Sequence, residues 1–470
     1  MRIGCFERRT SGAFFTARGA AVLLAAVVAA LAPPLAAPPA AAEEPLPNIV
    51  LIVTDDQRFD SMWALPNVEE ELVRRGTTFT QAHVVLPLCC PARASILTGQ
   101  YAHTTGIYGN GTTDARGGGF AEFDDTTTIA TVLDAARYRT GLVGKYMNGY
   151  PESYVPPGWD RWVGLSNSSG SYYEYDLTED NAVVHYGSAP EDYLTDVLAS
   201  KALDFLDAGA SRPFFLMWTP LAPHAMATPA PEYEHAFDGL PPWRPPSYAE
   251  ADVSDKPPWL QARKRWGAAA QTDIDAFREH QLESLLSVDD AVDDIVERLR
   301  SNGELENTLI VFTSDNGFLY GEHRLRAKDL PYEEATRVPM VYSYGPWAGA
   351  RESPDLATNI DIAPTIASLA GTAMPGAEGR DLGPYLAGAA SFPRAVHLIE
   401  GAGIRDVPSW CQLRSPLRVY TRYADGFEEL YNLAKDPYQL RNLATKTALS
   451  VQRARLRNLC NPLPPGMTPW

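Results

Sequence analysis

Three runs of apolar and β-branched residues constrain the fold of this chain more than any other feature. They are residues 47–54 (Pro-Asn-Ile-Val-Leu-Ile-Val-Thr), 213–219 (Pro-Phe-Phe-Leu-Met-Trp-Thr) and 309–313 (Leu-Ile-Val-Phe-Thr). Uninterrupted runs of this kind are typical of strands buried on both faces of a parallel sheet. Helices are predicted at residues 67–75, 127–138, 193–206, 277–299 and 359–370. The sequence therefore predicts an α/β fold with a mixed, mostly parallel sheet between helices.

Acidic and amide side chains directly follow two of the predicted strands. Asp55 and Asp56 follow the first strand, and Asp315 and Asn316 follow the third. Ligand sites in open α/β sheets gather at the carboxyl ends of strands, and paired acids there are typical of a site for a hard cation. A single aspartate after a strand would be ordinary turn chemistry, so the prediction depends on the pairing.

A cysteine stands at the start of a predicted helix in residues 88–99 (Leu-Cys-Cys-Pro-Ala-Arg-Ala-Ser-Ile-Leu-Thr-Gly). Pro91 fits the first turn, where its missing N–H has no cost. Cys89 then lies near free backbone N–H groups and the positive end of the helix dipole, which favours a thiolate or a bound anion. Arg93 follows Cys89 by four residues, so one helical turn returns it to the same edge. Two buried cysteines without a chemical role are the alternative.

This segment resembles the signature of the type I sulfatases, in which Cys, any residue, Pro, Ser or Ala, and Arg precede Leu-Thr-Gly. The resemblance extends from about residue 47 to residue 445. It implies an alkaline-phosphatase-like fold with a small C-terminal α+β subdomain that contains an antiparallel sheet. It also implies that Cys89, rather than Cys90, is oxidised to formylglycine (3-oxoalanine), with a formylglycine-generating enzyme as the partner during maturation.

The resemblance implies a set of metal ligands as well. Sulfatases hold a divalent cation with two aspartates after the first strand, a later Asp and Asn, and the formylglycine; here these are Asp55, Asp56, Cys89, Asp315 and Asn316. A ligand set made entirely of oxygen atoms favours Ca²⁺ or Mg²⁺ over Zn²⁺. The norm of the family favours Ca²⁺ over Mg²⁺.

Further basic residues match positions that bind sulfate in the family. Lys145 and Lys328 would neutralise charge on the sulfate, and His224 would hydrogen-bond the sulfate or protonate the leaving oxygen. Arg93 would orient the formylglycine. The hydrated formylglycine would attack sulfur, and its second hydroxyl would let the adduct release sulfate. Solvated surface positions are the alternatives for the two lysines, and a packed structural histidine is the alternative for His224.

One position departs from the family pattern. Many sulfatases have a histidine two residues after the lysine, but this chain has Met147, which cannot transfer a proton. His103, Asn148 or a water are the candidates for deprotonating the formylglycine adduct. The same departure occurs in N-acetylglucosamine-6-sulfatases and heparan 6-O-endosulfatases, which residues 144–148, 192–198 and 285–290 also resemble. The chain lacks a long basic insertion, so we expect exo action on small sulfated sugars.

Three other functions stay open at this point. The first is an arylsulfatase of broad range, and the second is a phosphonate or phosphate monoester hydrolase of the same superfamily. The third is a sulfated-glycan binder that keeps an unconverted cysteine. The intact signature and the four metal ligands favour an enzyme, because a protein that only binds sulfated glycans does not need all of these residues.

The N-terminal 42 residues are predicted to be a cleavable signal peptide. Four arginines precede an apolar run at residues 20–32, which is short for a bilayer, and three alanines at 40–42 fit a cleavage site. We therefore expect a secreted or extracytoplasmic protein without stable membrane insertion; a retained anchor is the alternative. The formal charge of −18 argues against nucleic acid as a partner, so basic side chains must cluster locally to hold a sulfated substrate.

The remaining chain is predicted to contain two parts. Residues 43–390 form the catalytic domain, and residues 391–470 form a C-terminal subdomain with short strands at 396–400, 418–423 and 429–432. In an exported protein Cys411 and Cys460 would pair in a disulfide, and two buried thiols are the alternative.

Overall fold

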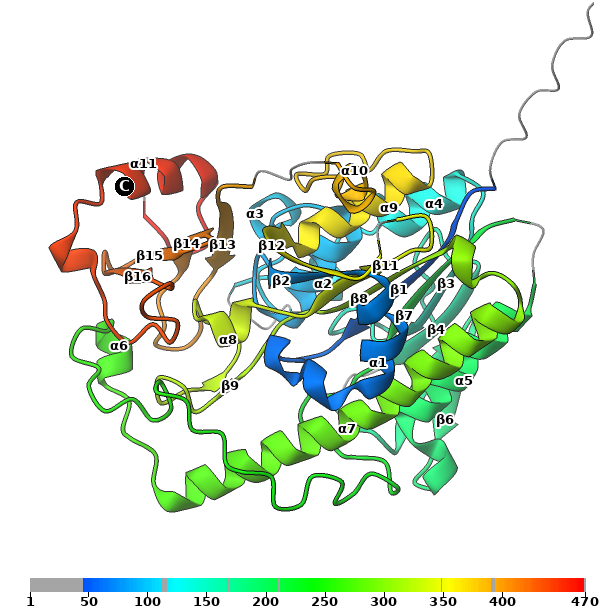
Figure 1. The fold of residues 1–470 in the computed structure, drawn as a ribbon, viewed down its shortest axis with the longest axis horizontal. Helices are drawn as coiled ribbons and strands as arrows, with labels where there is room; N and C mark the ends of the chain where they lie inside the picture. The colour runs from blue at the N-terminus through cyan, green and yellow to red at the C-terminus, as the bar shows by residue number, and fades with distance from the viewer. Residues whose placement is uncertain are drawn as a thin grey trace, which may run out of the picture. The chain divides into compact units, whose positions relative to one another are not determined.

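A ten-stranded sheet forms the centre of the structure (Figure 1). The structure is a computed structural model that describes residues 45–111, 116–166, 170–209, 212–347, 349–389 and 394–468. The strand order is β12-β2-β11-β8-β1-β7-β3-β4-β5-β6. The strands are β1 (Asn48–Thr54), β2 (Thr77–His83), β3 (Arg139–Gly144), β4 (Arg161–Ser166), β5 (Tyr175–Glu179), β6 (Ala182–Tyr186), β7 (Phe214–Thr219), β8 (Thr308–Ser314), β11 (Met340–Ser343) and β12 (Arg351–Thr358). The central strands β8, β1, β7, β3 and β4 are parallel, whereas β11, β5 and β6 pair antiparallel to their neighbours. The predicted mixed, mostly parallel sheet is confirmed.

Helices cover both faces of this sheet (Figure 1). One face carries α1 (Pro66–Glu71), α5 (Leu194–Asp207) and α7 (Ala268–Ser301); the other carries α2 (Cys89–Thr98), α3 (Ala102–Thr105), α4 (Ile129–Ala135), α9 (Ile362–Leu369) and α10 (Gly383–Leu386). Side chains of β1 alternate between the two layers. Val50 and Ile52 belong to the apolar cluster of α5 and α7, whereas Ile49, Leu51 and Val53 belong to that of α2, α4 and α9. Burial on both faces explains the uninterrupted apolar pattern of this strand.

Two regions differ from the sequence prediction. Helix α7 begins at Ala268, nine residues before the predicted start, because its first turns are mostly exposed and contain one large buried apolar residue, Ile274, which gives no apolar periodicity. Residues 157–187, for which the sequence predicts no helix or strand, contain β4, β5 and β6 at the edge of the sheet. The stretch between β7 and the short helix α6 (Pro258–Gln261) has no regular element, as expected from its prolines.

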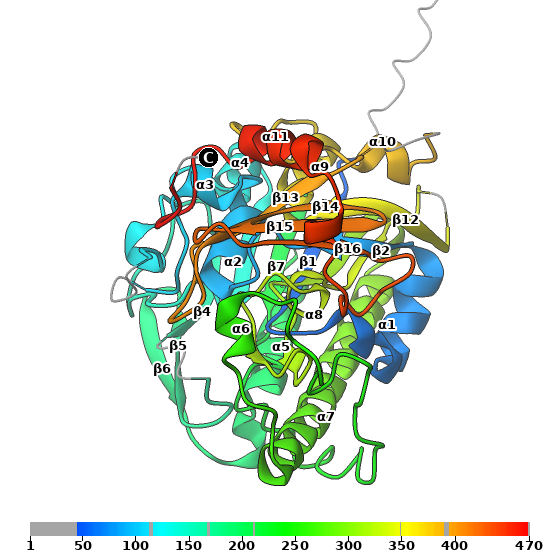
Figure 2. The same ribbon diagram turned by 90° about the vertical axis from the view of Figure 1, so that its left-hand side faces the viewer.

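A second, antiparallel sheet lies in the C-terminal part between α11 (Ser450–Leu459) and α6 (Figures 1 and 2). Its strands are β13 (His397–Gly401), β14 (Trp410–Ser415), β15 (Arg418–Tyr423) and β16 (Glu428–Asn432), in that order. The antiparallel sheet was predicted, but β14 was missed. A disulfide joins Cys411 on β14 to Cys460 at the end of α11, so the pairing alternative is confirmed.

Short elements complete the chain. They are the hairpin β9 (Leu319–Tyr320) and β10 (Arg326–Ala327), helix α8 (Glu333–Thr336), and 3₁₀ turns at Phe59–Ala64, Val73–Arg75, Phe120–Glu122, Pro190–Asp192, Leu305–Asn307, Asn359–Asp361 and Ala444–Lys446. Within the described part of the chain, no helix is both long enough and apolar enough to cross a membrane. The predicted signal peptide at 1–42 and the predicted domain boundary at 390/391 lie outside the described residues.

Candidate active site

Four predicted metal ligands meet at the carboxyl ends of β1 and β8. The register pairs Thr54 with Ser314, so the residues that follow each strand are neighbours although about 260 positions separate them. The backbone N–H of Asp56 donates to Asp315 Oδ1 (3.2 Å), and Asn316 Nδ2 donates to Asp56 Oδ1 (2.6 Å). Oxygen atoms of Asp55, Asp56 and Asp315 lie within 4.8 Å of one another, and all these side chains are buried.

Cys89 is the first residue of α2, and its side chain faces this group of acids. Its Sγ lies 2.9 Å from Lys328 Nζ and 3.6 Å from Asp55 Oδ1. The predicted thiolate is wrong for the unmodified residue. Burial, and next the charge of Asp55, raise the pKa of the Cys89 thiol to about 12 despite the two nearby lysines. At neutral pH the unmodified side chain is therefore a neutral thiol and a poor nucleophile.

Cys90 occupies a different environment from Cys89. Its backbone N–H donates to Asn110 Oδ1 (3.0 Å), and its Sγ accepts from the backbone N–H of Asn148 (2.9 Å). The side chain belongs to the apolar cluster between α2, α4 and the sheet. The two adjacent cysteines therefore differ in access to the acids, and Cys89 alone contacts them.

Arg93 lies one helical turn after Cys89 and holds the acidic residues together. Its guanidinium donates to Asp315 Oδ2 (2.8 Å), to Asp55 Oδ2 (3.2 Å) and to the carbonyl of Lys145 (2.8 Å). Arg93 and both carboxylates have no solvent exposure. The predicted return of Arg93 to the edge of the site thus brings it against the metal ligands.

Lys145 reaches the same acids from the end of β3, and its Nζ contacts Asp55 Oδ2. Gly144 makes this position possible. Its φ of +121° lies in a region that favours glycine, and a Cβ there would come within 2.1 Å of the Thr219 carbonyl oxygen on β7. Glycine at position 144 is therefore a structural requirement of this corner.

His224 stands beyond the end of β7, with Nε2 3.9 Å from Asp56 Oδ2. Its Nδ1 contacts the carbonyl of Ala225 (2.5 Å), which assigns the hydrogen to Nδ1 and leaves Nε2 facing the acids. Burial lowers the pKa of His224, although Asp55 and Asp56 oppose this shift. The neutral imidazole is therefore favoured before substrate binds.

Two residues that support His224 were missed in the sequence. Tyr172 Oη donates to the carbonyl of His224 (3.0 Å), and Gln281 Nε2 donates to the carbonyl of Pro223 (2.7 Å). Gln281 carries a usable signal, because it is a polar residue on the buried face of α7, one turn before Leu285. Tyr172 carries no comparable signal, since many aromatic residues surround it in the chain.

The two residues considered in place of the family histidine make other contacts. His103 Nδ1 lies 3.0 Å from Glu400 Oε1, and its Nε2 lies 3.7 Å from Glu378 Oε1. Asn148 contacts Cys90, and Met147 is buried in the apolar cluster. Both candidate side chains therefore already have partners, two carboxylates for His103 and the Cys90 thiol for Asn148.

The charges of the site favour a bound cation. Burial alone would raise the pKa of Asp55, but Lys145, His224, Arg93 and Lys328 hold it below its usual range. For Asp315, burial and the charge of Asp55 raise the pKa to about 6. Asn316 Oδ1 is buried without a hydrogen-bond partner among the described residues. An orphaned amide oxygen beside three carboxylates fits a hard divalent cation.

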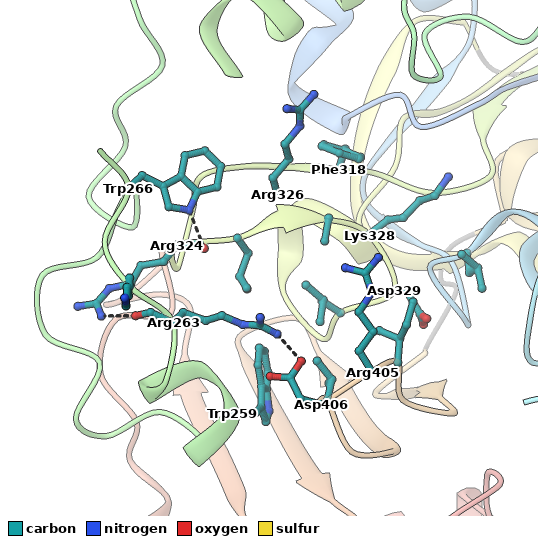
Figure 3. A pocket seen from close by; sticks show the side chains of 17 residues that line it. Trp259, Arg263, Trp266, Phe318, Arg324, Arg326, Lys328, Asp329, Arg405 and Asp406 are labelled. Atoms are coloured by element: carbon teal, nitrogen blue, oxygen red, sulfur yellow. Dashed lines mark hydrogen bonds and ion pairs between the residues drawn. The ribbon is translucent and has the colours of Figure 1, made fainter. Parts of the chain in front are cut away.

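A cavity of about 560 Å³ opens beside Lys328 (Figure 3). Its walls come from Leu88, which directly precedes Cys89, and from three further segments: residues 259–266, residues 318–330, and residues 404–407 of the C-terminal part. Because Lys328 contacts Cys89, this cavity adjoins the group of acids. A cavity of this size accommodates a small-molecule substrate.

Family comparisons agree with this geometry. A family model described as Sulfatase matches residues 47–372. The chain belongs to the sulfatase family. A second model, described as N-sulphoglucosamine sulphohydrolase, C-terminal, matches residues 321–462 of this sulfatase. Members of the family are sulfuric ester hydrolases.

Individual relatives cover different shares of their own length. Human N-acetylglucosamine-6-sulfatase is 34% identical over 456 residues, which is 85% of this chain and 81% of the human protein. The extracellular sulfatase SULF-1 homologs of Caenorhabditis elegans and Drosophila melanogaster are also 34% identical, but the chain spans only 47% and 33% of their lengths. Among solved structures, BT4656 in complex with its substrate D-glucosamine-2-N,6-O-disulfate has a TM-score of 0.76 at 24% identity, covering 88% of this chain and 96% of that chain. The alkaline-phosphatase-like fold is thereby confirmed.

Proposed function

We propose that this sulfatase is an exported enzyme that hydrolyses the 6-O-sulfate of N-acetylglucosamine or of a related sulfated sugar. The proposed activity rests on the position of Cys89, because its Sγ, in the first turn of α2, lies beside Lys328 Nζ and Asp55 Oδ1. The similarity to human N-acetylglucosamine-6-sulfatase over 85% of the chain supports the choice of sugar. The glucosamine disulfate in the solved neighbour supports the same choice.

The mature site would contain a formylglycine and a divalent cation, which supply chemistry that unmodified side chains lack. Formylglycine formed from Cys89 supplies an oxygen nucleophile in its hydrated form. A divalent cation, Ca²⁺ in preference to Mg²⁺, supplies Lewis-acid polarisation of the sulfate. The residues that would hold it are Asp55, Asp56, Asp315 and Asn316. The three aspartates would bring carboxylate oxygens to such an ion, and Asn316 would bring its amide oxygen.

The surrounding side chains position and neutralise the sulfate. Burial opposes the charge of Lys145 and Lys328, but neighbouring carboxylates raise the pKa of both, so both are cationic at neutral pH. Both would neutralise negative charge on the sulfate oxygens. The Nε2 atom of His224 faces the site, so the protonated imidazole would donate its proton from this atom to the leaving oxygen. Arg93 holds Asp55 and Asp315 in place.

Mass spectrometry of protein from its own host tests the nucleophile. Trypsin releases residues 76–93, which contain both cysteines, so fragmentation on either side of Cys90 must locate the change. We expect O in place of H₂S at Cys89 and an unmodified Cys90. A Cys90→Ala variant serves as the matched control and should retain the conversion, whereas Cys89→Ala should lose all sulfatase activity. Unmodified Cys89 in a protein that also lacks activity would refute the enzymatic proposal.

Substrate comparison separates the remaining functions. Turnover of N-acetylglucosamine 6-sulfate should exceed that of an aryl phosphonate by at least about 100-fold in kcat/KM, which corresponds to about 3 kcal/mol in the transition state. A preference for the phosphonate would indicate the phosphonate monoester hydrolase. Turnover of aryl sulfate without turnover of the sugar sulfate would indicate a broad arylsulfatase.

Export and maturation are part of the same proposal. The leader predicted at residues 1–42 would be removed, and the formylglycine-generating enzyme would act on Cys89 during maturation. N-terminal sequencing of the protein recovered outside the cytoplasm should begin close to Glu43. Recovery of the full-length chain in the cytoplasm would contradict export.

A further inference from the structure

A buried glutamine connects the turn of His224 to the hairpin beside the cavity. Gln281 lies on the inner face of α7 and is 1% exposed. Its Nε2 donates to the carbonyl of Pro223 (2.7 Å), and its Oε1 accepts from the hydroxyl of Tyr320. A carbonyl can only accept, so the amide nitrogen must face Pro223 and the amide oxygen must face Tyr320. The orientation of the Gln281 side chain is therefore fixed from both ends.

The carbonyl that Gln281 holds belongs to the peptide bond between Pro223 and His224. The N–H of the same peptide donates to the carbonyl of Leu221 (2.9 Å). His224 lies outside the regular elements, between β7 and α6, so such bonds rather than a helix or a sheet fix its backbone. Without the bond from Gln281 this peptide is free to rotate, and its rotation moves the imidazole ring.

Tyr320 belongs to the hairpin that carries Lys328. It lies on β9, and its partner in the register of β10 is Arg326, two residues before Lys328. Its side chain is 6% exposed, and the hydroxyl is directed to Gln281. Tyr320 thus links the segment that brings Lys328 to Cys89 with the residue that holds the turn of His224.

Arg58 fixes Tyr320 in turn. It follows Asp56 by two residues and is 2% exposed. Its guanidinium pairs with Glu322 (2.8 Å) and lies over the ring of Tyr320 (4.6 Å). Glu322 also accepts from the backbone N–H of Tyr320 (2.5 Å). A continuous chain of buried contacts therefore leads from the segment of the first two candidate metal ligands, through Tyr320 and Gln281, to His224.

We propose that Tyr320 and Gln281 position His224 as the acid for the leaving oxygen, so that substrates with poor leaving groups depend on both residues. The inference rests on the proposed function, in which His224 Nε2 gives its proton to that oxygen. As the S–O bond breaks, the leaving oxygen takes the electron pair and this proton. A sugar alkoxide is a strong base and needs the proton, whereas the ring of nitrophenolate stabilises the charge and makes the proton dispensable. Tyr320 and Gln281 act through His224 and are positioning residues.

Kinetics with two leaving groups test this inference. The ratio of kcat on N-acetylglucosamine 6-sulfate to kcat on 4-nitrophenyl sulfate measures the contribution of the acid. Gln281→Leu should lower this ratio by about 10- to 100-fold, the loss expected for a displacement of about 1 Å at a reacting group. Tyr320→Phe should lower it less, because Gln281 keeps its bond to Pro223. The change should be in kcat and not in KM, since neither substitution removes a group that binds the sulfate.

Tyr138→Phe is the matched control for the loss of a buried tyrosine hydrogen bond. Tyr138 has no solvent exposure, and its hydroxyl donates to the carbonyl of Pro47 (3.0 Å), at the opposite end of β1 from Asp55. Its ratio should equal that of the wild type. Tyr320→Phe removes a hydroxyl and keeps the ring, so it tests the chain of contacts even where Gln281→Leu does not fold.

A double substitution shows whether Gln281 acts through His224. His224→Ala alone should lower the ratio, because the acid is absent. Gln281→Leu added to His224→Ala should lower the ratio no further, since a positioning residue has no effect once the group that it positions is gone. A residue that only stabilises the fold would lower kcat on both substrates alike.

The outcomes separate this inference from the proposed function. Equal losses on the two substrates in Gln281→Leu and Tyr320→Phe, or a further fall of the ratio on the His224→Ala background, would overturn the positioning role and leave the sulfatase intact. An unchanged ratio in His224→Ala would overturn the assignment of His224 as the acid. Turnover of 4-nitrophenyl sulfate by the wild type without turnover of any sulfated sugar would overturn the proposed function itself.

Discussion

Replacing Arg93 by methionine should destabilise the protein strongly when divalent cations are removed. The Arg93 guanidinium donates three hydrogen bonds at 2.8–3.2 Å, two of them to carboxylates without solvent exposure. Methionine fills a similar volume but leaves Asp55, Asp315 and the Lys145 carbonyl with one partner fewer. Removing one member of a buried ion pair costs about 3–5 kcal/mol, because an uncompensated charge remains inside the protein.

Urea unfolding followed by tryptophan fluorescence measures this loss. With a chelator present, we expect Arg93→Met to lower the free energy of unfolding by about 3–5 kcal/mol. With saturating Ca²⁺ the loss should be smaller, because a cation held by Asp55 and Asp315 replaces the missing charge and stabilises the folded state by mass action. Arg93→Lys keeps the charge but lacks the guanidinium fork, so its stability should lie between those of wild type and Arg93→Met.

A surface substitution controls for the change in net charge. Arg455→Met, on the exposed side of α11, should change the free energy of unfolding by less than about 0.5 kcal/mol. Equal unfolding midpoints for wild type and Arg93→Met in chelator would refute the reasoning on buried charge. A larger loss with Ca²⁺ than without it would refute the assignment of Asp55 and Asp315 to the cation.

Three further predictions use other parts of the structure. Lys328→Met should lower kcat on aryl sulfate by about 100- to 1000-fold, because a cation beside the sulfate is lost, and a kcat within about 3-fold of wild type would contradict its role. Cys411→Ala combined with Cys460→Ala should lower the free energy of unfolding by about 4 kcal/mol, since the disulfide closes a loop with a sequence separation of 49. Added reductant should lower the urea midpoint of unfolding of the wild type and leave that of the double variant unchanged. Burial lowers the pKa of His83 from 6.5 to about 4, so the unfolded chain takes up a proton first on acidification. Stability should therefore fall by about 1.4 kcal/mol per pH unit between these two values, and His83→Asn should show a shallower slope in urea titrations across that range.

Sequence patterns were most informative where burial is complete. The run of β1 was predictable because both of its faces pack against helices, so every position had to be apolar. Strand β14 was missed for a related reason. Gln412 and Arg414 interrupt its apolar pattern, yet both are buried, because Gln412 donates to the Pro331 carbonyl and Arg414 pairs with Glu333. Such partners are distant in the chain and leave no local periodicity.

The prediction of a thiolate at Cys89 was wrong because of the tertiary environment of the residue, whereas its local structure was predicted correctly. The position at the start of α2 was correct, and a helix N-terminus does favour an anion. Burial and the charge of Asp55 outweigh that effect in the folded protein. Neither burial nor a carboxylate 34 residues away is visible in the twelve-residue segment from which the prediction came.

By itself, the sequence determined which residue types stand at the strand ends and at the start of α2, because buried strands and helix starts impose short-range patterns. The tertiary structure alone decided which of those ends meet. The pairing of β1 with β8 brings Asp55 to Asp315, and the hairpin of β9 and β10 carries Lys328 to Cys89. The cavity was likewise decided by the fold, since its walls come from segments around residues 260, 325 and 405. Contacts between such distant segments depend on sheet order and loop paths, which the local spacing of residues does not encode.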